Sequence, residues 1–317
     1  MTGPTASGKT ELLDSVFGRG ASSFFTALHA SNSPSLNLPL SASVISADSM
    51  QAYRGMDIGT AKPDSGLLER LPHYLLDIKD PDEQYTAGEF VRLADSICAS
   101  LAGKNSVPIL SGGTGFYLRN FICGAPLAPP SDPSMREEVG RDLASRGAAA
   151  LRGELEAADP ASAARIGEHD LYRLTRAVEI LRTSGLAPSC FAPSNKPRSE
   201  YDFLIIGMER PRAELKERIH ARVGTMFAAG LAGEVAALRA AGYGPTSPGL
   251  KAIGYGEFFE MEGSPLSDIA TAIELHTLQY AKRQMTFLRA LPGIVWIGAD
   301  PAELSSIIMK FLSAIPR

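Results

Sequence analysis

Residues 3–10 match the pattern GxxxxGK[ST] at every specified position, and they read Gly3, Pro4, Thr5, Ala6, Ser7, Gly8, Lys9 and Thr10. In this pattern the glycines let successive backbone N–H groups turn toward a phosphate, the lysine adds a positive charge, and the final hydroxyl can ligate Mg²⁺. A stretch with apolar residues at helical spacing follows directly at 11–17, as the motif requires. The segment, called the phosphate loop below, therefore predicts a phosphate or pyrophosphate site with Thr10 as the metal ligand.

Beyond this loop, short apolar segments alternate with helical ones. The helical segments include 89–102 and 266–291, both with apolar residues at helical spacing. Each predicted strand is brief and is followed by a polar or glycine-rich turn; the strands are Ser43–Ala47, Tyr74–Ile78, Val107–Leu110, Phe203–Met208 and Ile294–Ile297. The alternation predicts an α/β fold with a mostly parallel sheet.

Two stretches interrupt this alternation. Residues 18–42 are rich in Ser, Gly, Asn and Pro, and we expect mostly irregular structure there. The second stretch, 125–200, contains no convincing strand; a proline-punctuated linker at 126–133 and a breaker run at 187–197 enclose helical segments near 134–146, 147–157 and 169–184. We therefore expect an α/β core, formed by 1–124 and 201–317, that is interrupted by an all-helical insertion at 125–200.

The composition is that of an ordinary globular chain: of 317 residues, 44% are hydrophobic and 21% are charged, and the mean hydropathy is −0.01. The net charge of −4 excludes a globally basic nucleic-acid binder but allows a local basic face. Three isolated cysteines, Cys98, Cys123 and Cys190, favour reduced thiols in a cytoplasmic protein without zinc. Since no apolar run approaches the ~20 residues of a membrane helix, we expect no contact with a membrane.

Asp48 follows the apolar segment 44–47, where a nucleotide hydrolase or kinase carries an aspartate that organises Mg²⁺. It also opens a longer polar signature, 48–54, that continues to 57–63. A plain ATPase has no need of so many polar side chains at this point. From the residues alone, Asp48 is a catalytic carboxylate, a Mg²⁺ ligand or a helix cap.

Six blocks in order resemble the tRNA dimethylallyltransferase family, also called the IPP transferases. They are GPTASGKT at 3–10, SADSMQAYRGMDIGTAKP at 46–63, LSGGTGFYLR at 110–119, HDLYRLTRAVE at 169–179, KAIGYGE at 251–257 and YAKRQMTFLR at 280–289. The resemblance implies a core like that of nucleotide kinases and a helical insertion that grips the anticodon stem of tRNA. It also implies transfer of a dimethylallyl group from dimethylallyl diphosphate to N6 of adenosine 37.

The same resemblance assigns roles to the core motifs. Asp48 matches the family's general base, which takes the proton of the adenine amine, and Thr114 matches a threonine that touches the target nucleotide. Lys9, Thr10 and Mg²⁺ would stabilise the departing pyrophosphate. The expected catalytic residues are thus Asp48, Thr114 and Lys9, and the extruded base would be held by Asp48, Ser49, Met50, Gln51 and Thr114.

Further tRNA contacts are implied outside these motifs, at Arg136, Tyr172, Arg173, Leu174, Thr175, Arg176, Lys282 and Arg283. Arginine contacts to phosphate supply most nucleic-acid affinity, so such a face is compatible with a negative net charge. Two alternatives stay open here: Arg173 and Arg176 could form a solvated salt-bridge face with Glu179, and Lys282 and Arg283 an exposed helix face. The chain also departs from the family pattern at Tyr172 and Leu278, where glutamine and arginine are usual.

Three other functions compete with this one. A small-molecule kinase would use the phosphate loop but leaves the block at 172–176 without a purpose. An isopentenyltransferase acting on free AMP or ATP would not need the helical insertion. A non-catalytic nucleotide-binding module would not need the complete set of Lys9, Thr10, Asp48 and Thr114. We expect a monomeric enzyme that acts on tRNA and dimethylallyl diphosphate with Mg²⁺.

The start of the chain raises a separate question, because a phosphate loop normally leaves the end of a central strand of about five or six residues. Only Met1 and Thr2 precede Gly3. A missing strand would open a slot in the sheet, with unpaired backbone groups and exposed apolar side chains on both neighbours. We expect that the natural protein carries several more apolar residues before Met1, which supply this strand; the alternative is that Met1 and Thr2 suffice and the neighbouring strands close up.

Overall fold

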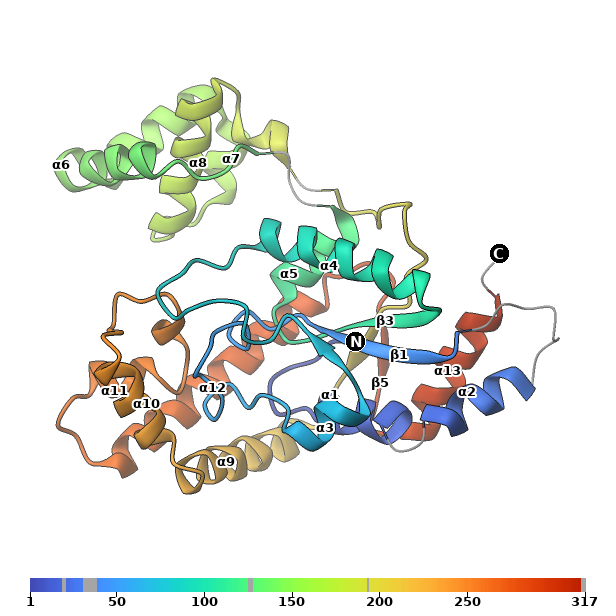
Figure 1. Cartoon of the computed structure of the whole chain (residues 1–317). Coiled ribbons are helices and arrows are strands. Elements are labelled where there is room, and N and C mark those ends of the chain that lie inside the picture. Colours follow the sequence, from blue (N-terminus) through green and yellow to red (C-terminus); the bar gives the residue numbers. More distant parts are fainter. Residues whose placement is uncertain (19–20, 31–38, 125–127, 193, 315–317) are drawn as a thin grey trace. The chain divides into compact units, whose positions relative to one another are not determined.

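A computed structural model describes residues 1–18, 21–30, 39–124, 128–192 and 194–314. They form two compact units, a core made of Met1–Ile122 and Arg198–Arg317, and a helical unit made of Cys123–Pro197 (Figure 1). The chain leaves and re-enters the core at one place, since the backbone N–H of Arg198 donates to the carbonyl oxygen of Ile122 at 2.8 Å. The Arg198 guanidinium also holds Asp95 through two bonds of 2.6 and 3.0 Å, which fixes this junction.

The strands of the core form two parallel sheets. The first has the order β2 (His73–Tyr74), β1 (Ser41–Ser46) and β3 (Ser106–Ser111), and the second pairs β4 (Ile206–Met208) with β5 (Val295–Ile297). Thr2 lies between the sheets, because it pairs in parallel with Gly112, directly after β3, and with Gly207 of β4. The α/β fold with parallel strands is confirmed.

Two strands are shorter than the sequence predicts. The prediction for Tyr74–Ile78 is wrong beyond β2, because Leu75 and Asp77 have positive φ values of 65° and 54°, which no strand accommodates. The prediction for Phe203–Met208 is wrong before Ile206, where the chain borders a cavity instead of a second strand. The local pattern of apolar residues therefore predicts strand length poorly, because pairing with neighbouring strands decides where a strand begins and ends.

Helices cover the sheets of the core. They are α1 (Lys9–Leu13), α2 (Ala21–Ala30), α3 (Ser65–Arg70), α4 (Ala87–Gly103), α5 (Gly115–Cys123), α9 (Arg212–Ala228), α10 (Leu231–Ala240), α11 (Gly256–Glu260), α12 (Leu266–Leu288) and α13 (Pro301–Ala314). The predicted helices at 89–102 and 266–291 are thereby confirmed as α4 and α12. Within the described ranges no single helix is long and apolar enough to cross a membrane; α9 and α10 meet that criterion only as a pair bent by 56°.

The expectation of irregular structure over 18–42 is wrong for its first part, which forms α2. Phe24, Phe25 and Leu28 of this helix are buried, and they lie on one helical face. The two phenylalanine rings pack against Phe17, with ring centroids 5.1 and 6.1 Å away. This apolar face outweighs the serines around it. Residues 31–38 lie outside the described ranges.

The helical unit consists of α6 (Pro133–Ala158), α7 (Pro160–Arg165) and α8 (Leu171–Ser184). Gly147, with φ of 78°, breaks α6 between the two helical segments predicted there. Leu151, Leu155 and Leu174 are fully buried in the core of this unit. Arg182 of α8 adds an ionic tie between helices, because it binds carboxylates of α6 at Glu138, Asp142 and Glu154 over 3.1, 2.7 and 2.7 Å.

Candidate active site

The phosphate loop runs from Thr2 to α1 in the predicted position. Gly8 has φ of 95°, a left-handed conformation that favours glycine, and a Cβ on Gly3 would lie 2.7 Å from the carbonyl oxygen of Met208. The Lys9 ammonium donates to the carbonyl oxygens of Gly3 at 3.0 Å and Pro4 at 2.8 Å. The lysine therefore holds its charge at the loop, where the motif predicts a phosphate.

Two arginines that the sequence analysis did not single out support this loop. Nε of Arg210 donates to the carbonyl oxygen of Ser7 at 2.5 Å, and Nε of Arg218 on α9 donates to that of Ala6 at 2.8 Å. Ala6 has φ of 59°, so the second bond secures a backbone conformation that alanine rarely adopts. Both arginines lie more than 200 residues away from their loop partners in the sequence, and no local motif predicts these contacts.

Lys9, Asp48 and Arg222 form the charged centre of the site. Burial lowers the pKa of Lys9 to about 8; the Asp48 carboxylate opposes this shift, and the Arg222 guanidinium adds to it. Burial also lowers the pKa of Arg222, again against the pull of Asp48. A pocket of 540 Å³ lies beside Arg222, between α9 and the residues around 57–64. Two cations thus meet one carboxylate, which suits an anionic ligand; the pocket itself is also lined by Asp57, Asp64 and Asp77.

We predict that pyrophosphate binding weakens as the pH rises above 8. The pKa of Lys9 is about 8 in the free protein, so the ammonium that attracts the anion becomes a neutral amine above this pH. Calorimetric titration should show an affinity that is steady below pH 8 and falls by up to about tenfold per pH unit above it. A Lys9→Arg variant stays charged and controls for the titration of pyrophosphate itself. A wild-type profile that parallels this variant would contradict the role of Lys9.

Asp48 stands two residues beyond the end of β1, at the carboxyl edge of the sheet. Its Oδ1 accepts the N–H of Met50 at 3.0 Å, which orients the carboxylate. Thr114 lies beside it after β3: its Oγ1 accepts the N–H of Ser49 at 3.0 Å, and its own N–H donates to the carbonyl oxygen of Ala47 at 3.1 Å. The structure therefore brings Asp48, Thr114 and Lys9 into one site, from three motifs that are far apart in the sequence.

Gln284 of α12 ties two of these motifs together. Its Oε1 accepts the N–H of Thr5 at 2.8 Å, and its Nε2 donates to the carbonyl oxygen of Gly113 at 2.8 Å. A Cβ on Gly113 would lie 2.1 Å from that Nε2, so a side chain at this position would displace the Gln284 amide. Tyr280, one turn earlier, is half-buried beside Thr114 and Gln284, and desolvation raises its pKa to about 12. The cations of this block are evident in the sequence, whereas no local pattern points to the role of Gln284.

Gln51 is fixed at both ends of its side-chain amide. The Ser46 hydroxyl donates to its Oε1 at 2.9 Å, and its Nε2 donates to the carbonyl oxygens of Thr60 at 3.3 Å and Ala61 at 3.2 Å. The loop that carries these carbonyls is anchored by Glu234 of α10, whose carboxylate accepts the N–H groups of Asp57, Ile58 and Gly59. Such support leaves the amide oriented before any ligand arrives.

The helical unit places its predicted contact residues in different environments. Tyr172 is 79% exposed, and the Arg173 side chain is 73% exposed although it pairs with Asp170 at 2.7 Å. Arg176 is more enclosed, since it pairs with Glu179 at 2.8 Å and donates to the carbonyl oxygen of Pro129. The Thr175 hydroxyl donates within its own helix, to the carbonyl oxygen of Leu171 at 2.9 Å.

The prediction that Leu174 contacts nucleic acid is wrong for its side chain. Leu174 is 0% exposed and packs in the core of the helical unit with Val139 and Leu151, because it lies on the apolar face of α8. Its neighbours Tyr172 and Arg173 lie on the opposite, solvated face. The family resemblance implies tRNA contacts for every residue from 172 to 176, but only some of these side chains lie on the surface.

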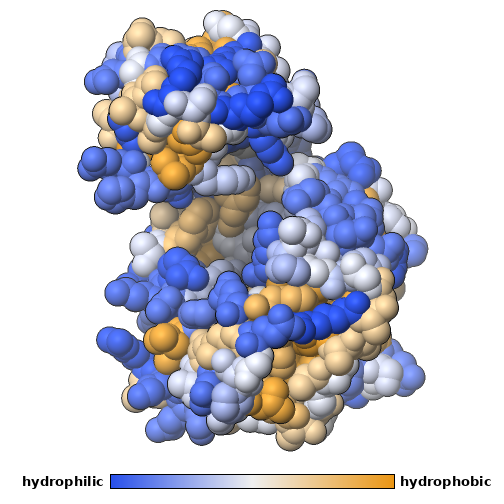
Figure 2. All heavy atoms as spheres, turned by 90° about the vertical axis from the view of Figure 1, so that its left-hand side faces the viewer, coloured by the Kyte–Doolittle hydropathy of each residue, from blue (hydrophilic) through white to orange (hydrophobic). Residues whose placement is uncertain are grey.

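Three further predicted cations lie on the surface. Arg136 of α6 is exposed and donates to the Ser131 hydroxyl at 2.6 Å. Lys282 and Arg283 are exposed on α12, with the Arg283 guanidinium 5.8 Å from the centre of the Tyr280 ring. Figure 2 shows a mixed face on the helical unit, in which strongly hydrophilic side chains predominate.

Comparisons with known proteins agree with the motifs. A family model described as IPP transferase matches residues 51–291. A tRNA dimethylallyltransferase of Geobacter sulfurreducens is 39% identical over 98% of this chain and 95% of that protein. The crystal structure of the tRNA isopentenylpyrophosphate transferase of Bacillus halodurans is 31% identical, with a TM-score of 0.65, over 98% of this chain and 95% of that one. A eukaryotic dimethylallyltransferase acting on tRNA shares the fold, with a TM-score of 0.77 at 22% identity, over 99% of this chain and 79% of that one.

Proposed function

This chain belongs to the IPP transferase family, and we propose that it transfers the dimethylallyl group of dimethylallyl diphosphate to N6 of adenosine 37 in tRNA. The products are N6-isopentenyladenosine and pyrophosphate. One observation carries the proposal: Lys9 and Arg222 face the Asp48 carboxylate within one site. The cations suit a diphosphate leaving group, and the carboxylate suits an amine that must lose a proton.

Asp48 supplies the base. The exocyclic amine of adenine is a poor nucleophile, because its lone pair is delocalised into the ring. As the new bond forms between N6 and the allylic carbon, the carbon–oxygen bond to the diphosphate breaks and its electron pair leaves with the diphosphate. Asp48 takes the N6 proton in this step, held in place by the Met50 N–H.

The phosphate loop stabilises the leaving diphosphate through its N–H groups, Lys9 and Arg222. The chain also fits a divalent cation, because the Thr10 hydroxyl is exposed at the start of α1 and bonds to no other described residue. No three acidic, histidine or cysteine side chains within the described ranges form a metal cluster, so the diphosphate itself would supply most ligands to Mg²⁺. When bound, Mg²⁺ neutralises the charge that develops on the diphosphate.

The acceptor base must leave the anticodon stack to reach Asp48. We assign the holding of this base to Ser49, Met50, Gln51 and Thr114, which surround the carboxylate. Gln51 is the most specific of them, because an oriented amide can pair with an adenine edge. Gln51 bonds to the loop that Glu234 anchors, so its amide is already oriented before the adenine base binds.

We assign the grip on the anticodon stem to the helical unit, through Arg136, Tyr172, Arg173, Thr175 and Arg176, and to Lys282 and Arg283 of the core. Exposed arginines and an exposed aromatic ring are the groups that bind phosphates and unstacked bases. We also propose that the protein works in the cytoplasm, as a monomer.

The direct test incubates the protein with dimethylallyl diphosphate, Mg²⁺ and unmodified tRNA, followed by nucleoside digestion and mass spectrometry. We expect isopentenyladenosine at position 37 only. Parallel reactions with AMP and ATP as acceptors test the free-nucleotide alternative, and prenylated mononucleotide would favour that function. Phosphorylation of an added acceptor with consumption of ATP would favour a kinase.

We predict that Arg173→Ala weakens tRNA binding and lowers the slope of log affinity against log salt by about one. The reason is the loss of one phosphate contact, since the Arg173 side chain is exposed and pairs with Asp170 three residues earlier in the chain. Arg141→Ala is the matched control, because Arg141 is equally exposed in a surface pair with Glu137 but lies outside the predicted block. An unchanged slope for Arg173→Ala would mean that this arginine belongs to a solvated salt-bridge face.

A further inference from the structure

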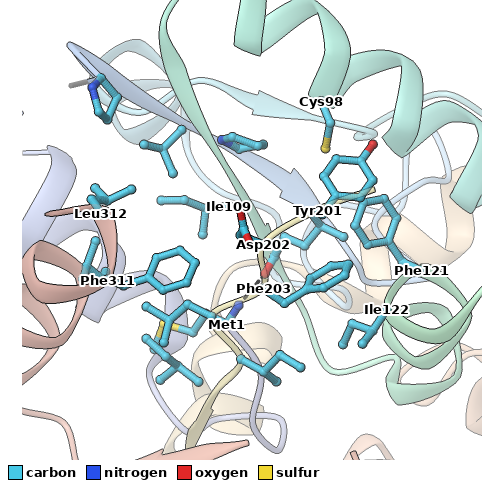
Figure 3. Close-up of a pocket in the computed structure, with 18 of the residues that line it drawn as sticks. Met1, Cys98, Ile109, Phe121, Ile122, Tyr201, Asp202, Phe203, Phe311 and Leu312 are labelled. Carbon is cyan, nitrogen blue, oxygen red and sulfur yellow. Dashed lines mark hydrogen bonds between the residues drawn. The ribbon is translucent and has the colours of Figure 1, made fainter. Parts of the chain in front are cut away.

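Polar contacts decide which purine the site accepts, because the edges of adenine and guanine differ in their donors and acceptors. The apolar cavity of 510 Å³ beside β3 cannot make that choice, since Figure 3 shows side chains such as Ile109, Phe203 and Phe311 around it. Polar groups gather instead around Gln51, which is half-buried three residues after Asp48. The groups that Gln51 can offer to a base therefore bear on specificity.

Both amide protons of Gln51 are engaged by backbone carbonyls. Its Nε2 donates to the carbonyl oxygens of Thr60 at 3.3 Å and Ala61 at 3.2 Å. A carbonyl can only accept a hydrogen bond, so the nitrogen of the amide must face this loop and not the oxygen. The amide oxygen accepts one hydrogen bond, from the Ser46 hydroxyl at 2.9 Å, and keeps a second lone pair. Gln51 therefore offers a base an acceptor and no donor.

An acceptor without a donor selects for an amino group. Adenine carries the N6 amine at this edge, which donates, whereas guanine and hypoxanthine carry a carbonyl oxygen there, which accepts. The amide oxygen of Gln51 attracts the amine and repels the carbonyl. The adenine amine has two hydrogens: in the proposed reaction one moves to Asp48, and the other stays on N6 in the product. Gln51 can hold this second hydrogen throughout the transfer.

The loop of residues 57–61, which carries the two carbonyls, is held by a carboxylate from α10. One oxygen of Glu234 accepts the N–H groups of Asp57 at 2.9 Å and Ile58 at 2.8 Å. The other oxygen accepts the N–H of Gly59 at 3.2 Å. Ala61 has φ of 49°, a left-handed conformation that alanine rarely adopts, so the shape of the loop depends on contacts from outside it.

Tyr255 adds a buried hydroxyl to the same contacts. Its hydroxyl donates to Glu234 at 2.5 Å and accepts the N–H of Gly59 at 3.1 Å. Burial, and then the hydrogen bond to Glu234, raises the pKa of Tyr255, so the hydroxyl keeps the proton that it donates. A Cβ on Gly59 would lie 2.4 Å from the Tyr255 ring, which shows how closely the loop packs against it. The contacts thus run from Glu234 and Tyr255 through the loop to Gln51.

We propose that Glu234 and Tyr255 are positioning residues that make the site specific for a purine with an amino group. They hold the loop, the loop engages both amide protons of Gln51, and Gln51 is left with an acceptor. Without this support the amide can turn over and present its donors, which would pair with the carbonyl of guanine or hypoxanthine. The inference rests on the proposed function, because it concerns the base that receives the prenyl group.

The test measures affinity for two anticodon stem-loops that differ only at position 37, where one has adenosine and the other inosine, the nucleoside of hypoxanthine. We expect the wild type to prefer adenosine by at least about tenfold, as matched base-edge contacts do. In Glu234→Ala this preference should fall by about fivefold or more, because Gln51 is free to turn over. Single-turnover prenylation of the adenosine form should slow by about tenfold or more, since the amine is no longer held in place.

Two further variants separate positioning from stability. Tyr255→Phe keeps the buried ring and removes only the hydroxyl, so the preference for adenosine should fall in the same direction by about two- to threefold. Glu262→Ala is the matched control, because Glu262 is an exposed carboxylate that pairs with Arg239 of α10 and makes the same change in net charge. We expect the control to keep the wild-type preference. Pyrophosphate affinity should stay within about twofold of wild type in all three variants.

A lower melting temperature of Glu234→Ala with an unchanged preference for adenosine would show that Glu234 only stabilises the fold, and it would overturn the inference. An equal loss of preference in Glu262→Ala would also overturn it, because the effect would then follow net charge. These outcomes leave prenylation by the wild type intact. If the wild type itself forms no isopentenyladenosine on tRNA, the proposed function is wrong, and this inference is wrong with it.

Discussion

Asp48→Ala is expected to lower the turnover of tRNA prenylation by about 10²–10⁴-fold, the usual contribution of a general base. The carboxylate stands beside Thr114 at the edge of the sheet and faces two cations, so its removal takes away the proton acceptor for the adenine amine. Pyrophosphate binding should persist, because the hydrogen bonds that shape the phosphate loop come from Lys9, Arg210 and Arg218. Single-turnover kinetics at saturating tRNA measure the effect on chemistry alone.

Asp48→Asn provides the sharper variant. An asparagine oxygen can still accept the Met50 N–H, so the turn should survive while the basic oxygen is lost. The asparagine and alanine variants should therefore lose similar amounts of activity. A loss of tenfold or less in the asparagine variant, with a larger loss in the alanine variant, would show that Asp48 acts by shaping the turn.

Lys9→Met is expected to lower the single-turnover rate by about 10²–10³-fold, which is the effect of removing one preorganised group that stabilises a developing anion. The diphosphate gains charge as the allylic bond breaks, and the Lys9 ammonium lies at the loop where that charge arises. Affinity for pyrophosphate should fall in the same variant. Methionine keeps most of the volume of the side chain, so the loop loses the charge rather than its packing.

Lys216→Met is the matched control for this change. Lys216 is an exposed lysine of α9, the helix that also carries Arg218 and Arg222, and its removal alters the net charge equally. We expect less than a twofold change in rate for it. Comparable losses in both variants would mean that Lys9 acts through the general field of the protein and not through contact with the diphosphate.

Much of the fold and of the site could be predicted because short motifs encode backbone geometry. The glycines of the phosphate loop, at fixed spacing, predict its conformation. The polar signature that begins at Asp48 predicts the end of a buried strand. Helix α2 escaped prediction for the opposite reason: its serines suggested a loop, whereas three apolar side chains on one face decided the outcome. Tertiary burial overrides local propensity in such a segment.

The residues that support the site could not be predicted as a group. Arg218 and Arg222 lie on α9, which reads as an ordinary amphipathic helix, and Arg210 lies just before it. Arg210 and Arg218 bond to the phosphate loop, and Arg222 interacts with Lys9 and Asp48. Glu234 holds the loop before Lys62 through backbone N–H groups, and any carboxylate at the right place could do so. Such contacts depend on the path of the chain between distant segments, which no local pattern encodes.

The junction at Ile122 and Arg198 makes the helical unit an insertion whose two ends meet at one place in the core. A backbone hydrogen bond joins the two ends of the inserted segment, and Asp95 of the core holds the returning segment through Arg198 and Tyr201. In evolutionary terms, the segment between these residues could lengthen, shrink or be exchanged while the sheet and the phosphate loop stayed unchanged. Acceptor choice could then diversify among relatives independently of the prenyl chemistry.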